Sequence, residues 1–213
     1  MSAKVGQFVD GIDRLLISGE ADITVHSAKD VPVDSKSGIR ALAYLARGAT
    51  SDFVLSKEMN GWKKLSKVLQ NKSSKPLMDV LEDLPMKSKV GTVSGRRQSF
   101  LLSSRPDIIP ISVRGHIETR LDGLLDGRVS FLILAEIGLK RLYESNEISK
   151  RHLGLNATRI REEDWPTAPG QGAIAVHCRD EDSSLTEKIR TILNHEPTFN
   201  EVERERSVLK RLG

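Results

Sequence analysis

Arginines follow strand-like segments in the middle of the sequence, and the first two are adjacent. Arg96 and Arg97 come just after "KVGTVS", beside Ser94, at the start of a predicted helix. Cations in the first turn of a helix oppose the helix dipole, which favours anions at that end. Such a pair predicts a bound carboxylate or phosphate, and the alternative is a solvated pair on a surface helix.

The same arrangement recurs further along the chain. Arg114 ends the strand-like "DIIPISV", Arg120 lies in the helix predicted to follow it, and Arg141 comes after the apolar "SFLILA". The carboxyl ends of parallel strands lie at one edge of a sheet, where ligands of α/β proteins bind. Arginines gathered at one edge predict a basic cleft for a ligand with several carboxylates.

A lysine and an aspartate follow a strand-like segment near the start of the chain. Lys29 and Asp30 come after "ADITVHS" and just before a proline. Their position beyond the end of a strand suits a binding site. The alternative is a surface lysine beside an aspartate that caps a turn.

Length and composition limit the class of protein. Of 213 residues, 33 are Lys or Arg, 29 are Asp or Glu, 38% are hydrophobic and 4% are aromatic. Because the basic residues are dispersed among acids and aromatic side chains are few, we expect no nucleic-acid partner. No apolar run approaches the ~20 residues that span a bilayer, and no leader opens the chain, so we expect a cytoplasmic protein without a membrane partner. The sequence also has no glycine-rich nucleotide-binding motif, and its single cysteine, Cys178, fits a reducing compartment.

The elements that position these residues alternate between helical and strand periods. "KVGTVS", "DIIPISV" and "SFLILA", separated by helical segments, predict βαβ units and a parallel sheet. "AIAVHC" predicts a further strand, with two helices after it. The polar stretch 57–75 predicts a surface insertion, part helix and part loop. Near the start, "QFVDGIDRLLISG" predicts a helix that ends at Gly19 and buries one apolar face, formed by Phe8, Val9, Ile12, Leu15 and Leu16.

Five collinear motifs resemble porphobilinogen deaminase, also called hydroxymethylbilane synthase. They are "HSAKDVP", "GTVSGRRQ", "VRGHIETRL", "LILAEIGLKRL" and "PGQGAIAVHCR", in that family's order and with nearly its spacing. The resemblance covers almost the whole chain apart from 57–75. It implies a transferase of tetrapyrrole and haem biosynthesis that condenses four porphobilinogen molecules into the linear hydroxymethylbilane and releases ammonia.

The resemblance also implies a fold. We expect an α/β protein with two periplasmic-binding-protein-like (type II) lobes and mainly parallel sheets. The first lobe is expected to comprise residues 1–50 and 168–213, and the second lobe residues 51–167. Because the chain begins beyond the family's first strand and helix and ends before its third domain, we expect an incomplete first lobe and no third domain. A monomer is the expected state.

The site residues carry over motif by motif. Asp30 resembles the family's catalytic aspartate, whose carboxylate contacts pyrrole nitrogens and stabilises the cationic azafulvene formed when ammonia leaves. No metal site is expected. The residues expected to bind substrate or cofactor are Lys29, Ser94, Arg96, Arg97, Arg114, Arg120, Arg141 and Gln171.

The family extends a dipyrromethane cofactor that is attached through a cysteine. That cysteine has no counterpart in this chain, and Cys178 is expected to be a small buried residue of a strand. The alternative function is a non-catalytic relative that binds polycarboxylates or polypyrroles. Asp30 favours the enzyme, because a pure polycarboxylate binder gains nothing from an anion beside its arginines and azafulvene chemistry requires one.

Overall fold

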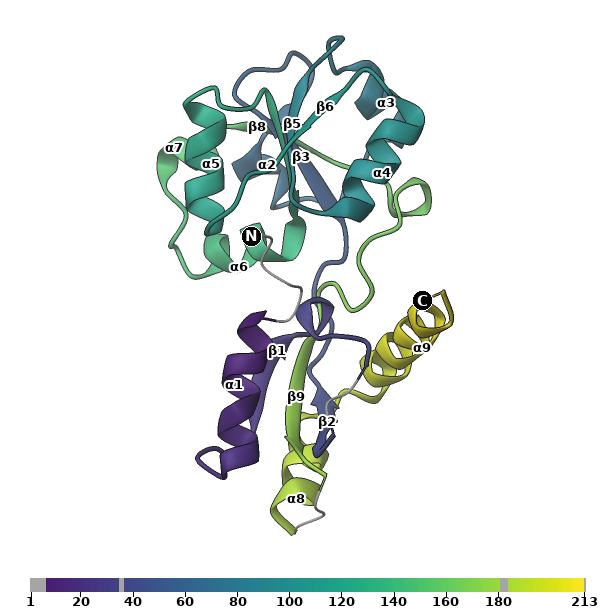
Figure 1. Ribbon diagram of the computed structural model, residues 1–213. Coiled ribbons are helices and arrows are strands. Elements are labelled where there is room, and N and C mark those ends of the chain that lie inside the picture. The colour runs from purple at the N-terminus through teal and green to yellow at the C-terminus, as the bar shows by residue number, and fades with distance from the viewer. Residues whose placement is uncertain (1–6, 35–36, 181–183, 213) are drawn as a thin grey trace. The chain divides into compact units, whose positions relative to one another are not determined.

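The chain forms two compact α/β units (Figure 1). The computed structural model describes residues 7–34, 37–180 and 184–212. Unit 1 comprises Met1–Ala49 and Ala168–Gly213, and unit 2 comprises Thr50–Thr167. Within the described ranges, no helix combines the length and the apolar character that a membrane crossing requires.

Unit 2 is built on a six-stranded mixed sheet in the order β4-β8-β3-β7-β5-β6. β5 pairs in parallel with both β6 and β7. β3 pairs antiparallel with β7 and β8, and β4 pairs antiparallel with β8. The strands are β3 (Asp52–Ser56), β4 (Lys63–Lys64), β5 (Lys89–Gly91), β6 (Ile109–Ile111), β7 (Phe131–Ala135) and β8 (Asn156–Arg159).

The parallel part of this sheet is the part that the sequence pattern predicts. β5, β6 and β7 lie in "KVGTVS", "DIIPISV" and "SFLILA". The connecting helices are α4 (Gly95–Ser104) and α5 (Ile117–Leu125). The βαβ units are therefore confirmed, and the carboxyl ends of these three strands lie at one edge of the sheet.

Alternating side chains of the central strands contribute to two separate cores. On β3, Phe53 and Leu55 belong to one buried cluster and Val54 belongs to the other. Successive side chains of a strand point to opposite faces, so both faces of the sheet are buried. Figure 1 shows α5 and α7 on one side of the sheet and α3 and α4 on the other. The further helices of this unit are α2 (Leu65–Val68), α3 (Leu77–Glu82), α6 (Glu136–Glu144) and α7 (Lys150–Leu153).

The stretch 57–75 has mostly exposed residues, but four of its apolar side chains contribute to these cores. It contains β4, α2 and turns, so the expected mixture of helix and loop is present. Leu65, Val68 and Leu69 are buried in the same cluster as Phe53, and Trp62 is buried in the other. The stretch therefore packs on the sheet through these four apolar residues, and its interpretation as an insertion stays a prediction.

Unit 1 contains a three-stranded sheet in the order β1-β9-β2. β9 pairs antiparallel with both neighbours, so the expectation of mainly parallel sheets does not hold in this unit. The chain returns to this unit after residues 50–167, and β9 then runs between β1 and β2 in the direction opposite to both. The strands are β1 (Thr24–Ser27), β2 (Ile39–Tyr44) and β9 (Ile174–Arg179).

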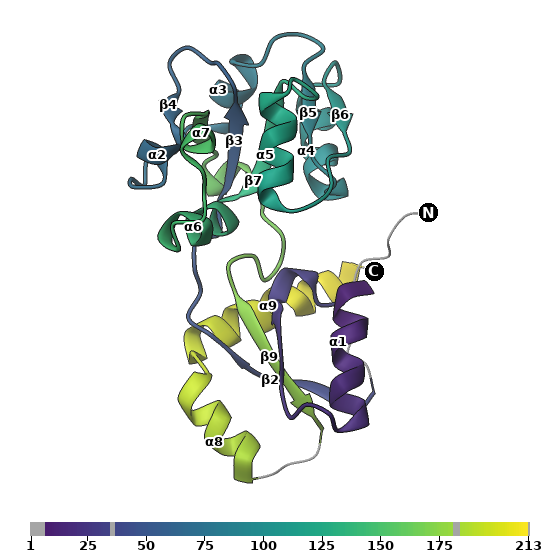
Figure 2. The ribbon, with the colours of Figure 1, turned by 90° about the vertical axis from the view of Figure 1, so that its left-hand side faces the viewer.

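Three longer helices pack on this sheet (Figure 2). They are α1 (Gln7–Ser18), α8 (Ser184–Leu193) and α9 (Glu196–Leu212). α1 contacts all three strands, whereas α8 and α9 contact β2. α8 and α9 are the two helices expected after "AIAVHC", and each is confirmed.

Helix α1 has a different buried face from the predicted one. Val9 and Leu16 are buried as expected, but the buried residue between them is Asp13. The exposed fractions of Ile12 and Leu15 are 43% and 41%, so these two residues lie outside the buried stripe. The side chain of Phe8 lies outside the described residues. The inner face of α1 is therefore partly polar.

Candidate functional site

Helix α4 begins where the sequence predicts, with Ser94 as its N-cap. Ser94 Oγ accepts a hydrogen bond from the backbone N of Arg97 at 3.4 Å. This contact satisfies one of the free backbone donors at the start of the helix. Arg96 and Arg97 consequently lie in the first turn, where cations oppose the helix dipole.

The anion beside these arginines is Asp52, which belongs to the same unit. Arg97 Nε and Nη2 donate to the two carboxylate oxygens of Asp52 at 2.7 and 2.6 Å. Arg97 Nη1 also donates to the Ile133 carbonyl at 3.3 Å, and Trp165 Nε1 donates to Asp52 Oδ2 at 2.9 Å. Asp52 is 0% exposed. The bidentate geometry and complete burial describe a structural ion pair.

This ion pair gives Arg97 a partner within the chain, and the ligand contact of Arg97 stays a prediction. The pair of arginines does meet an anion, as the helix position predicts, but the chain supplies that anion itself. Arg97 is only 8% exposed, and its guanidinium is bound to Asp52 and Ile133. Sequence patterns did not indicate this partner, because Asp52 lies 45 residues earlier, at the start of a strand that was not predicted.

Arg96 is the more accessible member of the pair. Its Nη1 donates to the Pro166 carbonyl, and its Nη2 lies 3.4 Å from Asp52 Oδ2. The guanidinium carbon is 6.0 Å from the ring centroid of Trp165. Burial lowers the pKa of Arg96, and the nearby charge of Arg97 acts in the same direction. Arg96 still carries a positive charge at neutral pH, because an arginine does not lose its proton in proteins.

The other three predicted arginines follow the neighbouring parallel strands: Arg114 and Arg120 come after β6, and Arg141 comes after β7. Arg114 is exposed in the loop after β6, and Arg141 is exposed in α6 after β7. Arg120, in α5, donates from Nε to the Gly115 carbonyl at 2.8 Å, which places its guanidinium beside the loop that carries Arg114. Because β5, β6 and β7 are parallel, all of these segments begin at the same edge of the unit 2 sheet.

Lys29 and Asp30 lie in a short 3-10 turn of unit 1, Ala28–Asp30, directly after β1. Asp30 is exposed and Lys29 is half-buried. Ala28 is buried, and its N donates to the Ala173 carbonyl at 3.0 Å. This hydrogen bond attaches the turn to the segment that leads into β9.

The glycines of "PGQG" allow the backbone to approach this turn closely. Gly170 has a φ of +73°, and a Cβ added to it would lie 3.0 Å from Ala28 Cβ and 3.2 Å from Lys29 N. Gly172 has a φ of +87°, and its added Cβ would lie 2.7 Å from the Gly48 carbonyl oxygen. Both positions thus require glycine for conformation and for space.

Gln171, between these glycines, is 1% exposed. Its carbonyl accepts a hydrogen bond from Arg47 Nε at 3.0 Å. Arg47 also forms a bidentate pair with Glu205, with distances of 2.7 and 3.0 Å, and Glu205 Oε2 accepts from Gly170 N at 2.7 Å. These contacts fix the backbone next to the Lys29–Asp30 turn, and the ligand contact of Gln171 stays a prediction.

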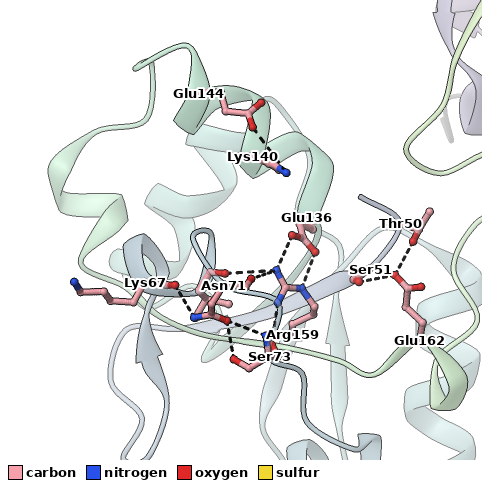
Figure 3. Close-up of polar contacts among 11 residues, drawn as sticks. Thr50, Ser51, Lys67, Asn71, Ser73, Glu136, Lys140, Glu144, Arg159 and Glu162 are labelled. Atoms are coloured by element: carbon pink, nitrogen blue, oxygen red, sulfur yellow. Dashed lines mark hydrogen bonds and ion pairs between the residues drawn. The ribbon is translucent and has the colours of Figure 1, made fainter. Parts of the chain in front are cut away.

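A second buried ion pair in unit 2 was missed by the sequence analysis (Figure 3). Arg159 Nε and Nη2 donate to the two carboxylate oxygens of Glu136, both at 2.7 Å. Further donors of Arg159 bind the carbonyls of Ser73 and Asn71, both at 2.9 Å. The guanidinium lies 4.9 Å from the ring centroid of Phe53. Arg159 therefore joins the start of α6 to the loop before α3.

A family model described as "Porphobilinogen deaminase, dipyromethane cofactor binding domain" matches residues 2–187. The chain belongs to the porphobilinogen deaminase family. The resemblance based on the five motifs is confirmed, and the matched range includes 57–75, which the motifs had left out. It also includes every predicted site residue.

The porphobilinogen deaminase of Nitratidesulfovibrio vulgaris (strain DP4) is 36% identical over 207 residues, which are 97% of this chain and 57% of that relative. The porphobilinogen deaminase of Thermus thermophilus is 34% identical over 206 residues, 97% of this chain and 59% of that relative. The chain thus spans less than two thirds of the length of these relatives. Among solved structures, an ancestral cationic amino acid solute binding protein aligns with 93% of this chain and 73% of that chain, at 15% identity and a TM-score of 0.47.

The described residues suit the carboxylates of the cofactor that the family model names, but they do not suit its covalent attachment. Arg114 and Arg141 are exposed and can bind the carboxylates of a dipyrromethane. Cys178, the one cysteine of the sequence, is 0% exposed on β9, which lies between β1 and β2. The expected burial of Cys178 is confirmed, and its thiol does not suit covalent attachment of a pyrrole.

Proposed function

We propose that this chain acts in the hydroxymethylbilane synthase reaction, in which porphobilinogen molecules are joined head to tail with release of ammonia. The observation that carries the proposal is the exposed Asp30 carboxylate on a backbone turn that buried contacts fix. Family membership and the arginines at the strand ends of unit 2 support it.

Asp30 is proposed as the catalytic carboxylate. When the carbon–nitrogen bond of an aminomethylpyrrole with a protonated amine breaks, the electron pair leaves with ammonia and a positive charge develops over the pyrrole ring. The ring N–H then donates to the Asp30 carboxylate, which stabilises the cation. The α-carbon of the neighbouring pyrrole attacks the methylene carbon, a carbon–carbon bond forms, and the attacking ring loses its α-proton to the released ammonia. The fixed turn lets Asp30 act without a large rearrangement.

Basic side chains are proposed to bind the acetate and propionate groups of the pyrroles. Arg114 and Arg141 are exposed and suit direct contacts, and Arg96, Arg120 and Lys29 are half-buried. Guanidinium groups bind carboxylates in a bidentate manner, which orients the ring as well as holding it.

The remaining predicted residues are proposed to position this set. Ser94 caps α4 and Arg97 holds Asp52, so both act on Arg96 through the start of that helix. Gln171 contributes through the segment that supports the Asp30 turn. A bound dipyrromethane supplies the end to which the next pyrrole is added, and no step here depends on its attachment to Cys178.

Ammonia release from porphobilinogen tests the proposal, together with porphyrin absorbance after oxidation of the product. Asp30→Asn is expected to lower turnover by at least about 100-fold, the scale seen when a group that stabilises a transition-state charge is removed. Its affinity for porphobilinogen, measured by titration calorimetry, is expected to change little. Asp34→Asn is the matched control, because Asp34 is a nearby carboxylate with a 90% exposed side chain.

Equal turnover of wild type and Asp30→Asn would overturn the role of Asp30. Porphobilinogen binding without ammonia release by the wild-type chain would overturn the enzymatic proposal and would favour the non-catalytic polypyrrole-binding alternative.

A further inference from the structure

Three buried side chains of unit 1 bring possible metal ligands together on the inner face of α1. Asp13 Oδ1 lies 3.0 Å from His26 Nε2 and 3.9 Å from His177 Nδ1. The three ligand atoms all lie within 4.8 Å of one another. The exposed fractions of the side chains are 4% for Asp13, 4% for His26 and 8% for His177.

The sheet register explains why these side chains meet. Thr24 of β1 is directly opposite His177 of β9, and His26 is two residues further along β1. Residues two apart on a strand share a face, so both histidines and Thr24 point the same way. The two imidazole centroids are 5.1 Å apart. Asp13, at the centre of the inner face of α1, covers this group.

The cluster includes a buried nitrogen whose hydrogen-bonding capacity is not used. Among the described residues, His177 Nδ1 has no hydrogen-bond partner. Its distance of 3.9 Å from Asp13 Oδ1 is too long for a hydrogen bond. A buried polar atom without a partner destabilises the fold, so such an atom requires an explanation. A bound ion would give this nitrogen a partner.

We propose that Asp13, His26 and His177 bind a divalent transition-metal ion, with Zn²⁺ as the representative ion. Two imidazole nitrogens and one carboxylate oxygen form a ligand set that Zn²⁺ and related ions accept. Bonds of ~2.0–2.1 Å in tetrahedral geometry separate ligand atoms by ~3.3 Å. The observed separations of 3.0 and 3.9 Å lie on either side of this value.

A cavity in the same unit supplies the fourth position. It has a volume of about 610 Å³, and its lining includes Asp13 and His177. We assign this position to a water molecule from the cavity. Thr24 Oγ1 donates to Asp13 Oδ1 at 3.3 Å, so it orients this ligand from the side. The 3.0 Å contact of Thr24 Oγ1 with His26 Nε2 belongs to the metal-free cluster, and the metal bond would replace it.

The charges around the cavity permit a cation. Glu203 and Asp180 line it together with Asp13 and add negative charge. Asp34 lines it as well, and the basic residues Arg40, Arg206 and Lys210 line it and oppose a bound cation. The Arg206 guanidinium donates to the Val31 and Pro32 carbonyls at 3.1 and 2.6 Å. These carbonyls offset part of its charge. No spacing motif connects residues 13, 26 and 177, which is why the sequence did not indicate this site.

Titration of the metal-stripped full chain with Zn²⁺ tests the inference, and we expect one ion to bind per chain. His177→Gln and Asp13→Asn are each expected to weaken binding at least about 100-fold, because loss of a residue that only supports a ligand already costs 10- to 100-fold. His116→Gln is the matched control, since His116 is exposed in unit 2. Circular dichroism of each metal-free variant checks its fold.

Substitution with Co²⁺ gives a second readout that needs no variant. We expect the intense visible absorption of four-coordinate Co²⁺, lost in His177→Gln and retained in His116→Gln. A spectrum like that of hydrated Co²⁺, or equal Zn²⁺ affinity in wild type, His177→Gln and Asp13→Asn, would overturn the proposal. Neither measurement depends on deaminase activity.

Discussion

Replacement of Arg97 by methionine tests whether its guanidinium serves the fold or an external ligand. The substitution removes the hydrogen bonds of 2.7 and 2.6 Å to Asp52 and leaves a carboxylate that is 0% exposed. Breaking a buried ion pair in this way costs roughly 3–5 kcal/mol. Trp165 Nε1 and Arg96 Nη2 still contact Asp52, so we expect the lower end, about 3 kcal/mol.

Urea unfolding followed by tryptophan fluorescence measures this loss within unit 2. Both tryptophans of the chain, Trp62 and Trp165, are buried in that unit, so the signal reports its unfolding. A loss of that size lowers Tm by roughly 10 °C. Arg128→Met is the control, because the Arg128 side chain is 72% exposed and its ion pair spans 3.8 Å. We expect it to stay within about 0.5 kcal/mol of wild type.

A double-mutant cycle with Asp52→Asn isolates the contribution of the pair. Each single substitution leaves one buried charge without its partner, whereas Arg97→Met combined with Asp52→Asn removes both charges. The double variant is therefore expected to be more stable than the sum of the single effects predicts, by about 2 kcal/mol. A cost below about 1 kcal/mol for Arg97→Met, or strictly additive effects, would refute the reasoning and return Arg97 to the ligand-binding set.

Three further outcomes are expected. Arg159→Met should cost about 3 kcal/mol in the same unfolding assay and should speed amide exchange in 71–73, because the carbonyls of that loop lose their donors; unchanged exchange there would contradict this. Gly172→Ala should destabilise unit 1 by roughly 1–3 kcal/mol in thermal unfolding, because its φ of +87° and the 2.7 Å approach to a carbonyl oxygen exclude a side chain. Burial first, and then the charge of His26, lowers the pKa of His177 to about 4, so the unfolded chain binds a proton there more readily. The free energy of unfolding of the metal-free protein should therefore fall as pH decreases from about 6.5 to about 4. His177→Gln should remove this part of the pH dependence. If wild type and His177→Gln have the same stability profile against pH, another group causes the dependence.

Local patterns predicted the elements whose stability depends on nearby residues. The three parallel strands and α4 follow from apolar runs, their separation and the Ser94 cap. The strand β3 was missed because its apolar run is only Phe53 to Leu55, between Asp52 and Ser56, and so short a run predicts no strand. β8 has four residues, all buried, and only one of them, Ala157, is apolar.

Contacts between distant segments were the part that sequence reasoning could not supply. Asp52 reaches Arg97 across 45 residues, and the position of Arg97 in a helix reveals only that an anion is favoured there. The inner face of α1 could not be predicted for the same reason. Asp13 interrupts its apolar stripe and forms hydrogen bonds with Thr24 and His26 of β1. The site predictions for Arg114 and Asp30 agree with their exposure, but exposure alone does not test binding.

The order β1-β9-β2 affects how the protein is assembled during synthesis. β1 and β2 leave the ribosome early, yet the strand that pairs with both is translated only after the whole of Thr50–Thr167. Unit 2 is continuous and has all of its strands by then, so it can collapse first. Until β9 is translated, β1 and β2 lack the strand that pairs with both, so their edges are open to non-native pairing during synthesis.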